Sequence, residues 1–166
     1  MNVTASGNSL TKSSGCDGCA DAGALSQQQI ASGDGYVEFT ASETSFLRTI
    51  GFKGRSSGVD TSEIPHAIRL KPDGVAEVRE HGMVRTVTTY VRGDVFRIAI
   101  VAGGIRYYKN GRLLYISGLA PAYPLLVSAS LQNRGATVTN AIIAGRFTQA
   151  AAPPTDGITS YPPPVR

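Results

Sequence analysis

Two cysteines stand close enough together in this sequence to do chemistry as a pair. Cys16 and Cys19 enclose an Asp-Gly pair, which permits the tight turn that a small disulfide ring requires. We expect a structural disulfide in an exported protein, or two plain thiols in a loop. A zinc site would need two more soft ligands, and His66 and His81 lack the paired spacing of a zinc finger. A redox-active pair would normally begin a helix in an alternating strand and helix pattern, and the sequence shows no such pattern.

The residues that could catalyse hydrolysis do not form a recognisable set. A glycosidase needs two carboxyl groups that face each other across the substrate. Glu77 and Glu80 are three positions apart, which puts their side chains on opposite faces of a regular strand, and Glu38 and Glu43 lie on either side of a turn. The G-x-S-x-G motif of a serine nucleophile is absent. The sequence therefore predicts a protein that is not an enzyme.

Arginines on consecutive predicted strands suggest a binding surface. Arg97 and Arg106 oppose the apolar positions of their strands, so both side chains point to solvent. Arginine beside tyrosine suits acidic or sulfated sugars, through charge-assisted hydrogen bonds and ring contacts. The alternative is an ordinary solvated face, and the chain has no tryptophan, the commonest sugar platform. The candidate ligand-binding residues are Arg79, Arg85, Tyr90, Arg97, Arg106 and Tyr108, with Arg69 in the same succession of strands.

Metal and histidine chemistry have weaker support. A calcium site stays open at the aspartates, although no EF-hand spacing occurs and structural roles are favoured for them. The aspartates concerned are Asp17, Asp21, Asp60 and Asp73. No other cofactor is expected. His66 is in phase with Ile68 and Leu70, so we expect a core or rim histidine and not a ligand-binding one.

Composition and charge exclude several classes of protein. Sixteen Lys and Arg against twelve Asp and Glu give a net charge of +4, which is too small and too dispersed for a nucleic-acid surface. No apolar run approaches the length that crosses a bilayer, so we expect no membrane insertion. The first residues carry no signal peptide, and we expect any such signal to lie upstream in a longer parent protein.

The elements that would position these residues are strands. From Tyr36 onward, apolar and polar residues alternate in short segments that Gly, Asn, Asp and Pro separate, with no helical stripe. We predict ten to twelve strands in an all-β, two-sheet antiparallel sandwich or jelly roll. We expect 36–42 and 46–52 to form a hairpin across a polar turn, and turns at 71–74, 103–104, 110–111 and 132–135. Further strands are predicted at 66–70, 75–80, 83–91, 95–102, 125–131 and 137–144, and also near Val3, near Leu10 and at 24–30.

Two segments interrupt this pattern. Lys53–Pro65 is a long polar stretch that predicts an exposed loop of the kind that often binds ligands. After Phe147 the sequence becomes rich in alanine and proline, which cannot continue a sheet ladder. We therefore predict a β-sandwich domain over residues 1–147 and a linker or tail over residues 148–166.

Four stretches resemble a module repeated in large secreted or surface-attached bacterial proteins. They are 35–44 (GYVEFTASET), 93–99 (GDVFRIA), 107–111 (YYKNG) and 122–127 (AYPLLV). That module is similar to concanavalin A-like sandwiches of the laminin-G and SPRY type, and the resemblance covers most of residues 2–145. It implies an extracellular β-sandwich attached to carbohydrate-active or adhesive partners, often with one bound calcium, and it implies no catalytic residues. At Pro65 and His66 the sequence departs from the acidic and aromatic residues of such modules.

The sequence thus favours a non-catalytic, lectin-like module of a larger secreted or surface protein, located outside the cell or on its surface. Its expected partner is a polysaccharide or glycan, with acidic sugars in view, and not nucleic acid. The alternative is a structural or adhesive module that self-associates into a fibre or surface array, through edge strands and its terminal segments.

Overall fold

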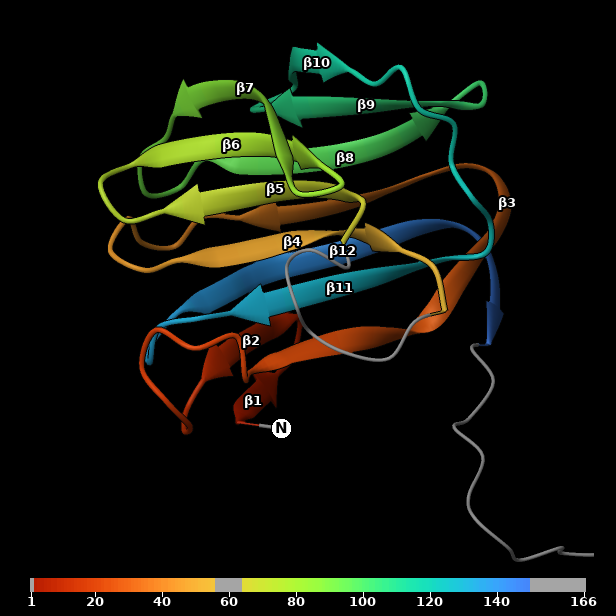
Figure 1. Ribbon diagram of the computed structural model, residues 1–166. Coiled ribbons are helices and arrows are strands. Elements are labelled where there is room, and N and C mark those ends of the chain that lie inside the picture. The colour runs from red at the N-terminus through yellow and green to blue at the C-terminus, as the bar shows by residue number, and fades with distance from the viewer. Residues whose placement is uncertain (1, 56–63, 150–166) are drawn as a thin grey trace, which may run out of the picture.

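The computed structural model describes residues 2–55 and 64–149, and within them it contains twelve strands, antiparallel pairings and no helix (Figure 1). The strands are β1 (Val3–Ser6), β2 (Ser9–Lys12), β3 (Gly23–Thr40), β4 (Arg48–Lys53), β5 (His66–Lys71), β6 (Val75–Glu80), β7 (Met83–Thr89), β8 (Val95–Val101), β9 (Gly104–Lys109), β10 (Arg112–Ile116), β11 (Leu125–Leu131) and β12 (Thr137–Gln149). The predicted all-β antiparallel class is confirmed. In the described part of the chain, no helix is long and apolar enough to cross a bilayer.

The strands form two layers that share β3 and β12. Sheet I contains β7, β6, β5, β4, β11, the first half of β3, where Gly23–Ile30 pairs with β11, and the end of β12, where Phe147–Gln149 pairs with β3. Sheet II contains β1, β2, β12, the second half of β3, β8, β9 and β10, and there Gly35–Thr40 pairs with β8. β3 passes from one layer to the other near Gly33, which has a φ of +70°. In Figure 1, β6 is drawn in front of β8.

The core lies between the layers. Period-two alternation turns the apolar side chains of each strand inward, where they leave water and pack against the facing sheet. The rings of Phe39 and Phe96 stack with centroids 5.8 Å apart, and Tyr90 meets Phe96 edge-on at 6.1 Å. Each buried Phe, Ile or Leu side chain contributes roughly 1.5–3 kcal/mol. The main inward residues are Val37, Phe39, Phe96, Ile98, Ile100, Ile105 and Tyr107 from sheet II, and Ile50, Phe52, Ile68, Leu70, Ala76, Val78, Leu125, Ala129 and Leu131 from sheet I.

Local turn signals set the hairpins. Asn110 and Gly111 both have positive φ, at 50° and 76°, which is the geometry of a two-residue turn that matches the twist of β9 and β10. Asp73 and Gly74 also have positive φ, in the three-residue link between the paired Lys71 and Val75 that closes β5 and β6. The turn between β8 and β9 lies one position earlier than predicted, because Ala102 and Gly103 adopt the positive φ and Gly104 begins β9.

The predicted hairpin of 36–42 with 46–52 is wrong. The second half of β3 pairs with β8 and β12, whereas β4 pairs with β5 and β11 in the other layer. The polar link between them is a crossing between layers, in which the Glu43 carboxylate accepts from the backbone N–H groups of Ser45 and Phe46. The buried Arg48 guanidinium donates to the carbonyls of Glu43 and Phe46, and its Nη1 lies 2.6 Å from Glu43 Oε1, so the link pairs its own charges.

The predicted strands at the start and at the end of the domain are shorter than the strands in the structure. Residues 24–30 and 36–42 are parts of one strand, β3, and β12 continues beyond Ala144 to Gln149. Thr148, just past the predicted end of the domain, accepts a hydrogen bond from the Gln29 amide. Most of the predicted loop (56–63) and most of the predicted tail (150–166) lie outside the described residues, so the domain boundary stays a prediction.

Candidate functional site

A groove of about 550 Å³ lies on the outward face of sheet II, over β3, β8 and β9. Its floor is formed by the small outward side chains of β8, which are Val95, Ala99 and Val101. They alternate with the buried Phe96, Ile98 and Ile100 of the core. Taller polar side chains on the neighbouring strands stand above this floor, so the groove has an apolar base and polar walls. The lining residues are Glu38, Val95, Arg97, Ala99, Val101, Tyr108, Asn110 and Gly111.

Arg97 is held in a fixed orientation from two sides. Its Nε and Nη2 lie 2.7 and 2.6 Å from Oε2 of Glu38, its cross-strand neighbour on β3. Its guanidinium carbon lies 4.0 Å from the ring centroid of Tyr36, which is a cation–π contact. In this ion pair Glu38 uses only Oε2, and Arg97 uses only Nε and Nη2. The second Glu38 oxygen and the remaining Arg97 N–H groups therefore stay available to a ligand.

The far wall of the groove is set by the β9–β10 turn. Tyr108 is the cross-strand neighbour of Arg97, so its ring stands on the same face. Asn110 accepts from the Val95 N–H and donates to Asp94, each at 2.8 Å, which fixes the turn against the start of β8. Burial alone would raise the pKa of Asp94, but hydrogen bonds from Asn110 and from a backbone N–H, with the charge of Lys109, outweigh it and lower that pKa. The carboxylate therefore stays ionised and keeps the turn in place.

Arg106 extends the same face beyond the groove. It is outward on β9, opposite Ala99 on β8 and Ile116 on β10. Among the described residues its guanidinium has no hydrogen-bond or ion-pair partner. Leu113 and Ile116 on β10 are exposed beside it. The face thus offers one clamped arginine, one unpaired arginine and a tyrosine ring.

The structure brings together only three of the six predicted ligand-binding residues, Arg97, Arg106 and Tyr108. Arg79 points outward from the other layer, with Nη1 2.9 Å from Glu77. Arg85 lies at a register shift in the β6–β7 pairing and is exposed, and its Nε reaches to 3.3 Å from the buried Glu80 carboxylate. Tyr90 is buried in the core, and its hydroxyl donates to the carbonyl of Lys71. Three of the six thus share one solvent face and the other three do not, and their role in binding a ligand stays a prediction.

Sequence reasoning missed Tyr36, Glu38 and Asn110 as members of the site. Glu38 alternates with buried Val37 and Phe39, so its outward direction was visible in the sequence. Its partner was not, because the pairing of β3 with β8 joins residues 59 positions apart. If the register of β3 against β8 were known, the opposite charges of Glu38 and Arg97 would have identified them as a cross-strand pair.

A second polar cluster lies buried between the layers. Glu80 accepts from the Tyr107 hydroxyl at 3.2 Å, lies 3.3 Å from Arg85 Nε and lies 3.7 Å from His66 Nδ1. Burial, followed by the Glu80 charge, raises the pKa of Tyr107. Burial lowers the pKa of His66, although the Glu80 charge opposes the change. His66 is thus a buried residue of the core, and Glu77 and Glu80 point to opposite sides of β6.

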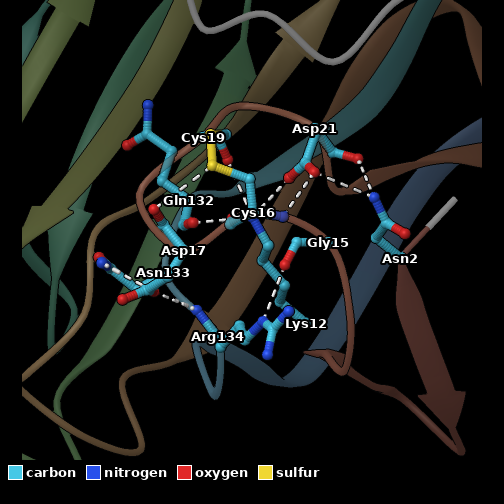
Figure 2. The surroundings of a disulfide bond; sticks show 10 residues. All are labelled: Asn2, Lys12, Gly15, Cys16, Asp17, Cys19, Asp21, Gln132, Asn133 and Arg134. Atoms are coloured by element: carbon cyan, nitrogen blue, oxygen red, sulfur yellow. Dashed lines mark hydrogen bonds and ion pairs between the residues drawn. A yellow bond between two sulfur atoms is a disulfide. The ribbon is translucent and has the colours of Figure 1, made fainter.

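The N-terminal loop carries the residues considered for metal binding (Figure 2). A disulfide joins Cys16 and Cys19. The buried Lys12 ammonium lies within 2.5–2.9 Å of four oxygens, which are the carbonyls of Cys16, Cys19 and Gln132 and a carboxylate oxygen of Asp21. Lysine thus brings its own positive charge to an oxygen-lined position of the kind that a metal cation could occupy.

The aspartates proposed as calcium ligands have protein partners. The hydrogen bond from Lys12 is the main cause that lowers the pKa of Asp21, and the backbone N–H of Arg134 does the same for Asp17. Asp73 lies in the β5–β6 turn, and Asp60 lies outside the described residues. Within residues 2–55 and 64–149, no group of three or more His, Cys, Asp or Glu side chains is gathered closely enough to hold a metal ion.

The sequence matches no protein-family model and no curated protein. The fold does match solved structures. A human SPRY domain has a TM-score of 0.61 at 14% identity, covering 84% of this chain and 94% of that one. The carbohydrate recognition domain of Emp47p has a TM-score of 0.56 at 6% identity, covering 90% of this chain and 86% of that one. The alginate lyase AlgAT5, from Polysaccharide Lyase family 7, has a TM-score of 0.50 at 15% identity, covering 84% of this chain and 68% of that one.

These similarities establish the fold. The chain is a jelly-roll β-sandwich of the kind found in SPRY and lectin domains, as the resemblance in sequence implied. One of the similar structures is a lyase, so the fold alone does not separate binding from catalysis. The assignment of function has to come from the groove.

Proposed function

We propose that this chain is a non-catalytic carbohydrate-binding module that holds a sugar unit in the groove on sheet II. The observation that supports this most is the clamped Arg97, which lies between Glu38 and Tyr36, with Tyr108 beside it on β9 and small apolar side chains of β8 next to it. Ligand sites are typically concave and mostly apolar, with a few fixed polar groups that set orientation. The groove has these properties, and its volume of about 550 Å³ suits one or two sugar rings.

The polar walls of the groove suit the hydroxyl groups of a sugar, and its apolar floor suits the C–H face of the ring. Sugar hydroxyls both donate and accept, so one hydroxyl can donate to Glu38 while a neighbouring one accepts from Arg97. Hydrogen bonds to charged groups are stronger than neutral ones, and here the charges are already oriented before the ligand arrives. The Tyr108 ring and the aliphatic side chains of β8 contact the apolar C–H face of the sugar.

An acidic sugar fits this face better than a neutral one. Arg97 is balanced by Glu38, whereas Arg106 has no partner among the described residues. A carboxylate or sulfate on the ligand would pair with this guanidinium. The proposal therefore extends to glycans that carry uronate or sulfate groups, located outside the cell or on its surface, where the Cys16–Cys19 disulfide persists.

A glycan array tests the proposal, with neutral, uronate-containing and sulfated polymers and three forms of the protein. The wild type should bind a defined subset of the array. Arg106→Ala should weaken the binding of acidic members about tenfold, because a charge-assisted hydrogen bond is lost. Arg92→Ala is the matched control, since this exposed arginine lies outside the groove and should leave the pattern unchanged.

Absence of binding to every glycan, or equal binding by Arg106→Ala and the wild type to the acidic members, would count against the proposal. Degradation of any polymer that binds would count against the non-catalytic part of it.

A structural or adhesive role is the second candidate, because β7 is an edge strand of sheet I with exposed aliphatic side chains. Met83, Val84 and Val87 are open to solvent there. An uncovered edge strand of this kind can pair with another copy. Sedimentation of the full chain, of Val87→Lys and of a chain without residues 150–166, which leaves β12 intact, tests this role. Oligomers that these changes abolish would support it, and a monomer at all concentrations would exclude it.

A further inference from the structure

The outward face of sheet II is continuous across five neighbouring strands. In spatial order they are β12, β3, β8, β9 and β10. The strand register lines up their outward side chains in two rows that run across the strands. Row A contains Ile142, Glu38, Arg97, Tyr108 and Leu113, and row B contains Ala144, Tyr36, Ala99, Arg106 and Ile116. The groove lies over the middle strands of these rows, so the face extends beyond it on both sides.

The spacing of the strands matches the repeat of an extended sugar chain. Neighbouring strands lie about 4.8 Å apart, which is close to the length that one sugar ring adds to such a chain. A glycan that crosses the strands therefore meets one strand with each sugar unit. The distance from β12 to β10 is about 19 Å at this spacing, so the two rows have the length of about five sugar units.

Both ends of the rows carry aliphatic side chains that are open to solvent. Ile142 on β12 is 43% exposed, and Leu113 and Ile116 on β10 are 45% and 55% exposed. Their sequence neighbours Ile143 and Leu114 pack against the core instead. Exposed apolar surface of this kind gains free energy when a ligand covers it. A sugar confined to the groove would leave these side chains in water, whereas a chain that crosses all five strands covers both ends.

The charged residues of the two rows leave one positive charge uncompensated. Glu38 and Arg97 neutralise each other on β3 and β8. Arg106 on β9 is the third charged residue of the rows, and it has no ion-pair partner among the described residues. A chain with an acidic group on every sugar would place further anions beside Glu38 and over the aliphatic ends. Those anions would lose water without gaining a cation of the rows as partner, which costs free energy.

We propose that this face binds an internal stretch of a glycan chain, about five sugars long, in which neutral sugars separate the acidic ones. The acidic group pairs with Arg106 on β9, and neutral sugars lie over the other four strands. Glu38 then determines specificity, because it cancels the charge of Arg97 and so disfavours a uniformly acidic chain. This inference rests on the proposed function and narrows its ligand from acidic glycans in general to this class.

Calorimetric titrations of the full chain with two polymers test the class of ligand. Deacylated gellan has neutral sugars between its uronates, whereas every sugar of polygalacturonate is a uronate. Gellan should bind about tenfold more tightly or better. Glu38→Gln leaves Arg97 without its counter-charge, so this variant should bind polygalacturonate about tenfold more tightly than the wild type does. No binding of gellan, equal affinity for the two polymers, or no effect of Glu38→Gln would overturn this class of ligand.

Gellan oligosaccharides of increasing length test the path across the strands. The affinity should rise until the chain has about five sugars and then stay constant. Backbone amide chemical shifts should change at both ends of row A, at Ile142 and at Leu113, in the same complex. Ile142→Asp should weaken the binding of the long oligosaccharides about tenfold and leave that of a disaccharide unchanged. Leu25→Asp is the matched control, since Leu25 is 37% exposed on the half of β3 that belongs to sheet I.

Equal affinity for short and long oligosaccharides, or no effect of Ile142→Asp on the long ones, would overturn the path across the strands and confine the sugar to the groove. The proposed function would survive that result, because it depends on Arg97 and Arg106 and not on the ends of the rows. Absence of binding to every member of the glycan array would instead remove both.

Discussion

At the scale of single residues, the most consequential side chain outside the groove is Lys12. Its ammonium is fully buried and is held by three carbonyls and Asp21, so it links β2 to the disulfide loop and to the turn before β12 (Figure 2). Removing one partner of a buried, hydrogen-bonded charge leaves the others without compensation.

We therefore predict that Lys12→Met lowers the free energy of unfolding by about 3 kcal/mol, measured by urea denaturation. Lys71→Met is the matched control, because that ammonium is 39% exposed in its ion pair and should cost less than about 1 kcal/mol. Equal effects of the two substitutions would show that the four oxygens around Lys12 do not depend on its charge.

His66 predicts how stability changes with pH. Its folded pKa is lowered from 6.5, mainly by burial, and Glu80, Tyr107, Arg85 and His81 are the titratable or charged groups around it. Below pH 6.5 the unfolded chain takes up a proton that the folded chain resists. The free energy of unfolding should therefore fall as pH drops from about 6.5 to the folded pKa, with no further loss below it.

Urea denaturation between pH 7.5 and pH 5 measures this loss, and His66→Gln should reduce it. Asp17, Asp21 and Asp94 act in a different window, because their lowered pKa values give stability that is lost only when pH falls below the ordinary value of 3.8. An equal loss of stability between pH 7.5 and pH 5 in wild type and His66→Gln would contradict the role of His66.

At the scale of elements, the tightest constraint is the contact between β4 and β5. A Cβ atom at Gly51 would lie 2.0 Å from the His66 carbonyl oxygen of the neighbouring strand, which is backbone and cannot turn away. Gly51→Ala should therefore separate these strands and lower the free energy of unfolding by about 3 kcal/mol.

Gly54→Ala, just beyond the end of β4, is the control for this prediction. A Cβ at Gly54 would meet nothing within 4 Å, so this change should stay within about 0.5 kcal/mol of the wild type. Thermal or urea denaturation of both variants checks the difference. A Gly51→Ala protein as stable as Gly54→Ala would mean that the strands approach less closely than described.

The same scale shows what the sequence could predict. Strand positions and hairpins such as β5–β6 and β9–β10 follow from local alternation and from dipeptides that accept positive φ, such as Asn110-Gly111. The same local alternation, within the β8–β9 hairpin, correctly placed Arg97, Arg106 and Tyr108 on one face. These predictions were right because each involves residues close in sequence.

Predictions that crossed between layers failed for the opposite reason. Whether Arg79 shares a face with Arg97 depends on which sheet each strand joins, and nothing in the alternation of β6 or β8 records that. The 18-residue strand β3 belongs to both layers. The next strand, β4, pairs with β11 and β5 and not with β3. A register shift between β6 and β7 then directs Arg85 to Glu80 and away from the groove. Such long-range pairings need the three-dimensional structure.

At the scale of the whole molecule, the two sheets present two different surfaces. Sheet II carries the open groove with its oriented Arg97–Glu38 pair, and sheet I ends in the edge strand β7 with exposed aliphatic side chains. The similar SPRY, lectin and lyase structures share this scaffold at low identity, so the chemistry of each surface has to be read from its own residues.

The groove on sheet II is the basis of the account, and calorimetric titration of its best array ligand into wild type and Arg97→Met tests it most directly. Arg97→Met removes the guanidinium but keeps an apolar stem over Tyr36, so the fold should persist while the affinity falls at least tenfold. An Arg97→Met protein that binds the same ligand with wild-type affinity would show that the sugar does not bind in this groove.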